Sequence, residues 1–150
     1  MTYDDIDRHM EAAHKLDRAA IPLGMYVAWC ANLQLLSREF TDAHAALVVR
    51  VRFREITGAE LLVAGCAGSL DHWHLNEEGR RFTEAYLPHY LDDFRATFDG
   101  DPYAVNDDWD HYDQIARVLT RKLMIARQSE AARPAAVLGT TDQRWWRRRR

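Results

Sequence analysis

The longest apolar run of the chain predicts a helix at the centre of the fold. Residues 21–36, IPLGMYVAWCANLQLL, include no charged side chain, and only Asn32 and Gln34 are strongly polar. Apolar side chains that cover nearly the whole circumference of a helix are typical of one surrounded by other helices. Pro22 suits a first turn, because its missing N–H needs no partner there. A helix of this length spans about 24 Å, too short for a comfortable membrane crossing.

Periodic apolar residues and capping residues predict further helices along the chain. A polar helix is expected over about residues 6–18, with Ile6 and Leu16 on its apolar face. Thr57 has the spacing of a capping box with Glu60, and Asn76 suits the cap of a long helix. These later helices should cover about residues 59–66, 77–98 and 107–126. The buried stripe expected for the long helix is Phe82, Ala85, Tyr86, His89, Tyr90 and Phe94.

The segment over residues 41–55 fits two patterns. Val49, Val51 and Phe53 alternate with arginines, as in a half-buried strand, but the segment also fits a helix opened by Thr41 or Asp42. We favour the helix, because a lone strand would leave its backbone groups unpaired. If the segment were a strand, it would most simply pair with a second copy of itself in a homodimer.

The composition fits one soluble helical domain. Hydrophobic residues make up 47% of the 150 residues and charged residues 29%, which is ordinary for a globular protein. Cys30 and Cys66 lie in apolar patterns and are expected to be buried, reduced thiols. No signal peptide is recognisable, so we expect a cytoplasmic location and no membrane contact. The predicted fold is all-α: a compact single-domain bundle of five or six helices over residues 1–126, with the central apolar helix at about 21–36.

Charge is distributed unevenly along the chain. Residues 1–125 hold 21 acidic and 13 basic residues, whereas residues 126–150 hold 2 acidic and 7 basic ones. Residues 127–150 lack a sustained period, and we expect a loose basic C-terminal tail. Residues 71–113 contain 12 acidic residues against three arginines. An acidic domain disfavours direct binding of nucleic acid and favours a basic protein partner.

Acidic and aromatic residues alternate between residues 90 and 113. Such a band can be a solvated face over aromatic core residues, or a docking surface in which aromatic anchors supply affinity and carboxylates supply steering. The docking interpretation assigns partner binding to Asp92, Asp93, Asp99, Asp101, Tyr103, Asp107, Asp108, Trp109 and Asp110.

Motifs for metal binding and catalysis are weak. His72 and His74 lack a metal-ligand motif, and the stretch over residues 99–110 departs from a calcium loop at Ala104, where glycine is needed. No nucleophile elbow or phosphate-binding loop is present. We therefore expect no metal, no cofactor and no enzymatic activity. An enzyme or small-ligand pocket using His9, His72, His74 or His89 with nearby carboxylates stays open as an alternative.

Several segments resemble a family of small uncharacterised bacterial proteins, a domain of unknown function. They span about residues 3–123, and Arg8 departs from the family's pattern, in which we expect an aromatic residue. The matching pieces are Tyr3-Asp4-Asp5 with His9, Gly24-Met25 with Ala28-Trp29, Arg54 to Glu60, Leu75 to Gly79 with Phe82, Tyr90 to Phe94, and Trp109 with Tyr112-Asp113.

The resemblance implies a bacterial cytoplasmic protein and brings no known reaction, cofactor or catalytic residue. Small acidic bacterial proteins of this kind often look like immunity proteins of toxin systems. Our leading hypothesis is therefore a non-enzymatic immunity protein that neutralises a cognate toxin by occluding its active site with the acidic, aromatic-rich surface. The alternatives are the small-ligand or enzyme pocket, and a self-associating adaptor that pairs through residues 49–53.

Overall fold

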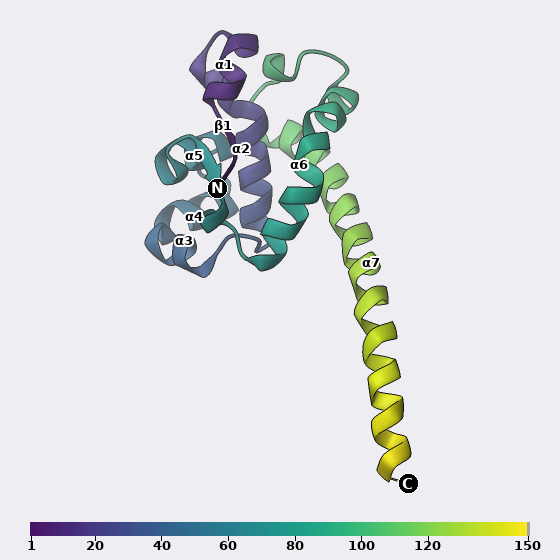
Figure 1. Cartoon of the computed structure of the whole chain (residues 1–150). Coiled ribbons are helices and arrows are strands. Elements are labelled where there is room, and N and C mark those ends of the chain that lie inside the picture. The colour runs from purple at the N-terminus through teal and green to yellow at the C-terminus, as the bar shows by residue number, and fades with distance from the viewer. Residues whose placement is uncertain (150) are drawn as a thin grey trace. The chain divides into compact units, whose positions relative to one another are not determined.

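Helices dominate the computed structural model, which describes the backbone of residues 1–149 and the side chains of residues 1–132 (Figure 1). In these residues seven α-helices accompany two short strands and two 3-10 helices. In chain order they are β1 (Thr2–Asp5), α1 (Asp7–Ala13), α2 (Leu16–Asn32), α3 (Arg38–Ala43), α4 (Ala45–Arg52), α5 (Gly58–Cys66), β2 (Ser69–Asp71), η1 (His72–His74), α6 (Glu77–Phe98), η2 (Pro102–Ala104) and α7 (Trp109–Arg149). The all-α prediction is confirmed.

The chain divides into two compact units, Met1–Val118 and Leu119–Arg150. The first contains every element up to the first turns of α7. The second continues α7 as far as Arg149. The predicted boundary between residues 126 and 127 therefore falls inside a helix. The side chains of the Trp-Trp-Arg ending lie outside the described residues.

Helix α2 is the core of the first unit, as its apolar composition predicts. Every residue from Ala19 to Ala31 is buried, and α2 lies between α5 and α6 (Figure 1). The predicted limits were wrong, since the helix begins at Leu16 and ends at Asn32. Pro22 therefore lies inside the helix instead of in its first turn. The carbonyl of Pro22 accepts a hydrogen bond of 2.5 Å from the Tyr90 hydroxyl of α6.

Two glycines allow the backbones of α2 and α5 to touch. A Cβ atom added to Gly24 would lie 2.5 Å from the backbone nitrogen of Ala59, and one added to Gly58 would lie 2.0 Å from the carbonyl oxygen of Gly24. Both separations are below any normal non-bonded contact, so a side chain at either position would force the helices apart. The Thr57 cap of α5 is as predicted, because its hydroxyl accepts the backbone N–H of Glu60 at 3.2 Å.

The predicted helix over residues 6–18 is interrupted. His14 has a φ of 68° and donates its N–H to the Met10 carbonyl, which ends α1, and Lys15 is extended before α2 begins. Leu16, expected on a buried face, is exposed. Hydrophobic spacing is continuous across this break, so the pattern could not show the change of direction at His14.

The segment over residues 41–55 is helical as far as Arg52, as favoured. It forms the end of α3 and all of α4, separated at His44, and Ser37 caps α3 instead of Thr41 or Asp42. Val48 and Val51 are buried while Val49 is exposed, which follows helical and not strand spacing. The alternative of an intermolecular strand over residues 49–53 is therefore wrong.

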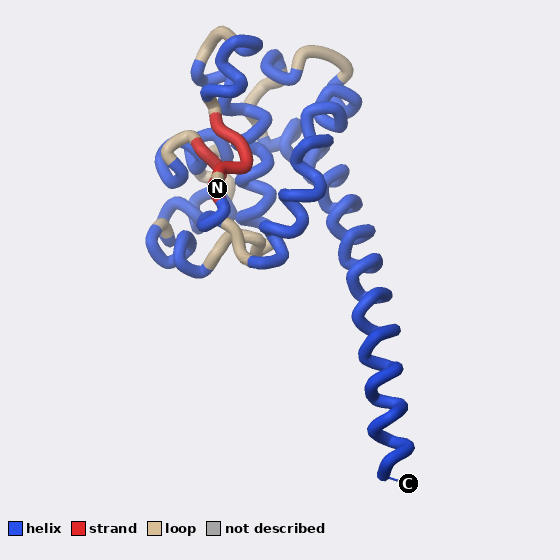
Figure 2. Tube along the Cα trace, in the orientation of Figure 1, coloured by secondary structure: helices blue, strands red, loops and turns tan. Residues whose placement is uncertain are grey.

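A two-stranded antiparallel sheet was not predicted. Strand β1 pairs with β2, with Asp4 opposite Leu70 and Asp5 opposite Ser69 (Figure 2). Both strands are short and polar, so no alternation of the kind that marks a strand is visible in the sequence. The sheet brings the N-terminal segment to the connector between α5 and α6.

Helix α6 matches its predicted limits. The Asn76 side chain accepts the N–H of Gly79 at 2.8 Å and so caps the helix. Phe82, Tyr86, Tyr90 and Phe94 are buried as expected, but Ala85 and His89 are exposed, so the predicted stripe was too wide. Cys30 and Cys66 are both buried and unbridged, and burial raises the pKa of the Cys66 thiol to about 12.

Candidate functional site

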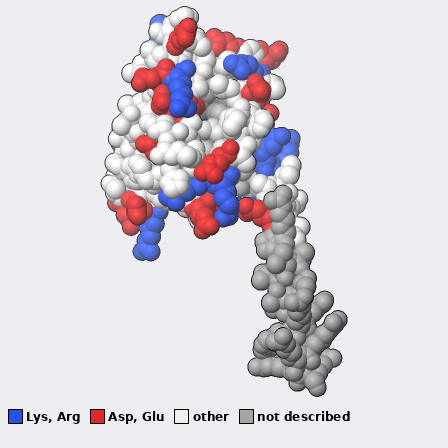
Figure 3. Space-filling model, in the orientation of Figure 1, with Lys and Arg blue, Asp and Glu red and all other residues white. Residues whose placement is uncertain are grey.

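The acidic residues proposed for partner binding occupy three adjoining elements. Asp92 and Asp93 lie on the last turns of α6, Asp99 and Asp101 on the loop that follows, and Asp107, Asp108 and Asp110 at the start of α7. A ring contact of 5.4 Å between Phe98 and His111 joins the end of α6 to the start of α7. In Figure 3, acidic side chains gather at the end of α6 and along the loop after it.

Five of these carboxyl groups are exposed, and we call them the acidic surface: Asp92, Asp99, Asp101, Asp108 and Asp110. Arg95 is the one arginine or lysine in the sequence between Asp92 and Asp110, and it lies 3.5 Å from Asp92. This stretch of sequence therefore has an excess of negative charge, as its composition predicts, and Arg18 and Arg54 are the cations that reach it from elsewhere in the chain.

Other acidic residues of the set support the local structure. The Tyr86 hydroxyl donates to Asp93 at 2.7 Å, and this carboxyl is half-buried. Burial raises the pKa of Asp107 above its usual value, although a hydrogen bond from Thr57 opposes that shift. The Asp93 carboxyl is bound within α6 and the Asp107 carboxyl to Thr57 at the start of α5, so both are poorly placed to meet a partner.

Two carboxyls of the acidic surface also cap the starts of helices, Asp101 for η2 and Asp108 for α7. Asp101 accepts the N–H of Tyr103 at 2.9 Å. Asp108 accepts the backbone N–H of His111 at 2.8 Å and lies 2.6 Å from the Nδ1 atom of its ring. These hydrogen bonds lower the pKa of Asp108 below its usual value, because they favour the ionised carboxyl.

The two proposed aromatic anchors differ in exposure. Trp109 is half-buried, whereas Tyr103 is 5% exposed. Arg54, which the sequence interpretation did not assign to the site, lies 4.9 Å from the centre of the Trp109 ring. The same guanidinium donates to both carboxylate oxygens of Asp113, at 3.2 and 2.6 Å. Arg54 has a φ of 61°, and it ties the loop after α4 to the first turns of α7.

Tyr103 belongs to a buried polar network with His9. From the sequence, His9 was named for a pocket but was not connected to Tyr103. The Tyr103 hydroxyl lies 2.5 Å from Nδ1 of His9, and Nε2 of His9 lies 2.8 Å from an oxygen of Asp4. The carbonyl of Tyr103 accepts a hydrogen bond from Arg18 at 3.2 Å. Both ring nitrogens of His9 thus have hydrogen-bond partners, and the ring orients Asp4. The available signal was that Asp4 and His9 belong to one of the sequence pieces that resemble the family.

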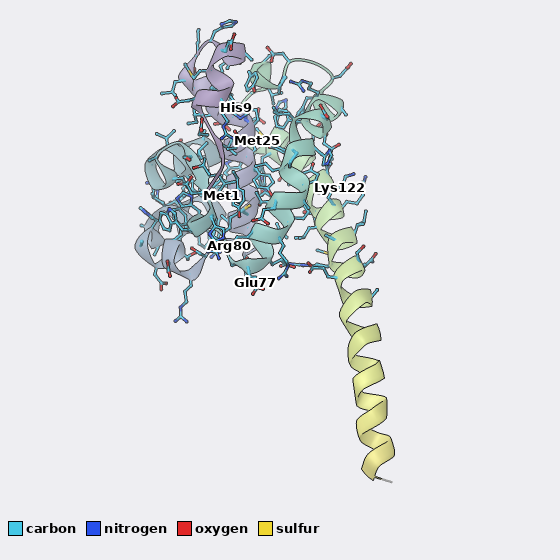
Figure 4. The ribbon with its side chains drawn as sticks, in the orientation of Figure 1. Met1, His9, Met25, Glu77, Arg80 and Lys122 are labelled. Carbon is cyan, nitrogen blue, oxygen red and sulfur yellow. The ribbon has the colours of Figure 1, made fainter. Side chains whose placement is uncertain are left out.

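Asp4 and His9 also line a cavity of about 480 Å³ between β1, α1 and α6. Figure 4 places His9 and Met1 on the side of the unit where β1 runs, and Figure 3 shows a hollow in that face. Tyr3 and Glu84 line the same cavity and are joined by a hydrogen bond of 3.0 Å.

The other histidines considered for a pocket do not join His9. His74 is buried, accepts the backbone N–H of Asp71 at 2.9 Å, and has its pKa lowered by burial. His72 is half-buried on η1, and His89 is exposed on α6. Only His9 of the four lines the cavity. In the part of the chain whose side chains are described, no group of three or more His, Cys, Asp or Glu could hold a metal ion.

The fold and these sites define a small helical domain with an acidic surface and a separate polar cavity. A family model described as a domain of unknown function, DUF7832, matches residues 2–106. The chain belongs to this family, which confirms the resemblance to an uncharacterised family, although the match ends before the expected residue 123. Neither the curated proteins nor the solved structures contain a match to the chain. Among the described residues, no helix is long and apolar enough to cross a membrane.

Proposed function

We propose that this chain is a bacterial, cytoplasmic immunity protein that binds a cognate toxin and occludes its active site without catalysing a reaction. The single observation that carries the proposal is the acidic surface. Five exposed carboxyl groups lie on adjoining elements with one arginine among them in sequence. Toxins that act on anionic substrates need basic active sites, and such sites are complementary to a surface of this charge.

The surroundings of the acidic surface support its role in recognition. Capping bonds hold Asp101 and Asp108 in place, so their carboxylates are ordered before a partner arrives. Preorganised groups lose less conformational entropy on binding. Trp109 is half-buried beside them. It offers the kind of partly exposed aromatic side chain that is enriched among the dominant residues of protein interfaces. Tyr103 is buried, so its proposed role is to position the loop between α6 and α7 and not to contact the partner.

The first experiment identifies the partner. The tagged chain would be purified from its native bacterium, and bound proteins identified by mass spectrometry, with attention to the product of the neighbouring gene. We expect a stoichiometric basic protein that stops growth when expressed alone and is harmless when co-expressed with this chain. Absence of any such partner would contradict the immunity proposal.

The second experiment tests the surface. Asp99→Lys with Asp110→Lys reverses two exposed charges that neither cap α7 nor bind Thr57. We expect toxin affinity to fall by about tenfold or more, because charge pairs close to an interface contribute this much. The matched control is Glu11→Lys with Asp42→Lys, which reverses two exposed acids on α1 and α3. Equal affinities of the two double variants would show that the acidic surface is not the interface.

A small-ligand pocket is the second candidate function, because the structure contains the cavity beside His9 and Asp4. Of the four histidines named for this alternative, His9 lines the cavity and the other three do not. Self-association through an extended segment over residues 49–53 does not fit the structure, since residues 49–52 lie in α4 and Val51 is buried.

A further inference from the structure

The cavity between β1, α1 and α6 carries an inference that does not depend on toxin binding. Its volume of about 480 Å³ is within the range of small-molecule sites. Its walls come from segments far apart in the sequence, with Tyr3 and Asp4 on β1, His9 on α1, and Glu84, Leu87 and Leu91 on α6. All of these lie within the unit Met1–Val118.

One side of the cavity is anionic. The Asp4 carboxylate is held by Nε2 of His9 at 2.8 Å and by the Asp5 backbone N–H at 2.9 Å. Glu84 accepts the Tyr3 hydroxyl at 3.0 Å. A carboxylate offers about four lone-pair positions, so each of these groups can accept further hydrogen bonds from a ligand.

The basic groups at the cavity already have acidic partners, because His9 pairs with Asp4 and the N-terminal charge of Met1 acts on Asp71. None of the residues that line it is Lys or Arg. Arg80, which acts electrostatically on Tyr3, donates its Nε–H to the carbonyl of His72 at 2.9 Å and is not a lining residue. Burial, with the hydrogen bond to Glu84, raises the pKa of Tyr3 to about 12, so the phenol stays a neutral donor at physiological pH.

The other side of the cavity is apolar. Leu87, Pro88 and Leu91 line it from α6, and Tyr90 contributes an aromatic ring. We propose that this cavity binds a primary ammonium or guanidinium group carried on a short hydrocarbon chain. Asp4 and Glu84 receive the cation, and the α6 wall receives the hydrocarbon. Such a group can belong to a free amine or to a basic side chain of a polypeptide.

The test is calorimetric titration of the full chain with n-butylammonium and n-butylguanidinium. Butyrate is the control of opposite charge, and n-butanol is the uncharged control. We expect saturable 1:1 binding of the cations, weakened by added salt because part of the attraction is electrostatic. Butyrate and butanol should bind far more weakly. Absence of saturable cation binding, or equal binding of butyrate, would overturn the proposal.

Variants locate the binding. Glu84→Gln keeps a hydrogen-bond acceptor for Tyr3 but removes the charge, and should weaken cation binding roughly fivefold or more, as for a partly exposed charge pair. Leu87→Arg places a cation in the cavity and should abolish binding. Glu11→Gln, an exposed acid of α1 outside the cavity, is the control. Thermal unfolding of each variant checks the fold, and unchanged affinity in both cavity variants would overturn the assignment.

A further probe separates the two sources of the cation. N-acetyl-arginine amide carries the same guanidinium on a blocked backbone. If it binds as well as n-butylguanidinium, the cavity accepts a basic side chain of a polypeptide. If only the small amines bind, the cavity is a site for a free amine. If the Leu87→Arg variant still binds the toxin, the proposed immunity function stands, whether the cavity takes a free amine or a basic side chain.

Discussion

Neighbouring carboxyl groups at the start of α7 have opposite electrostatic surroundings. Asp107 is half-buried, and burial raises its pKa despite a hydrogen bond from Thr57. Asp108 is exposed, and hydrogen bonds from His111 lower its pKa. Sequence reasoning treated both as equivalent members of a docking surface. Their difference depends on which groups fold against them, and therefore on tertiary structure.

The first prediction follows from the sign of each shift. A lowered folded-state pKa contributes stability above the unfolded value, about 3.9 for Asp, and that stability is lost as pH falls through the folded value. Asp108→Asn should therefore lower the free energy of unfolding at neutral pH. A raised pKa contributes stability only at low pH, and this is lost as pH rises through the folded value. Asp107→Asn, which keeps an acceptor for Thr57, should therefore raise the free energy of unfolding at neutral pH.

The measurement is urea unfolding of the two variants and the parent chain at neutral pH and at about pH 3, below the unfolded pKa. Both differences from the parent should shrink at the lower pH, where the carboxyls of the parent become protonated. Differences of the same sign for the two variants at neutral pH would contradict the prediction.

A second prediction concerns Arg54. Its guanidinium makes a two-point ion pair with Asp113 and lies over the Trp109 ring. Both charged side chains are nearly half exposed, so solvent screens the pair. Arg54→Ala should lower the free energy of unfolding by about 1 kcal/mol. Arg38→Ala is the control, since Arg38 is almost fully exposed and lies 3.8 Å from Asp42. Equal stability of the two variants would show that Arg54 does not hold the start of α7.

At the scale of elements, the presence of a helix and its capped start follow from local sequence, whereas the breaks between helices depend on tertiary contacts. The caps at Thr57 and Asn76 are in place because each acts within its own first turn. The breaks at His14 and His44, in contrast, redirect the chain without interrupting the hydrophobic spacing. The close approach of α2 and α5 depends on two glycines, Gly24 and Gly58. The sequence contains both glycines but does not show that they face each other.

A third prediction tests this approach. Gly58→Ala places a methyl group against the Gly24 carbonyl. It should cost about 3 kcal/mol of unfolding free energy or prevent folding, because the two nearest atoms belong to that backbone carbonyl and cannot move aside. Ala64→Ser, at an exposed position of the same helix, is the control. Circular dichroism and urea unfolding report the result, and a parent-like stability of Gly58→Ala would contradict the packing described.

At the scale of the whole molecule, the family match and the folded unit end at different places. The match covers residues 2–106, whereas the first compact unit continues to Val118. Within that unit Tyr112 is buried and its hydroxyl accepts a 2.6 Å hydrogen bond from Asn32 of α2. Ile115 is also fully buried. The first turns of α7 are therefore part of the core.

A fourth prediction follows for fragments. A fragment over residues 1–126 should unfold cooperatively. One over residues 1–106 should lose several kcal/mol of stability or fail to fold, because burying a large apolar side chain contributes about 2 kcal/mol. Urea unfolding of the two fragments beside the full chain makes the comparison. A fragment over residues 1–106 as stable as the longer one would show that α7 is dispensable for folding.

Sequence alone determined what depends on near neighbours: a mainly helical fold, the apolar helix α2, the capped starts of α5 and α6, and a strongly acidic stretch. These follow from side chains within a turn or two of one another. Only the tertiary structure decided that β1 pairs with β2, that Tyr103, His9 and Asp4 form one network, and which carboxyls stay exposed. Those outcomes depend on contacts between residues far apart in the sequence, such as His9 and Tyr103. The hydrophobic periodicity of a segment reports only on residues near one another in the chain, so it cannot predict such contacts.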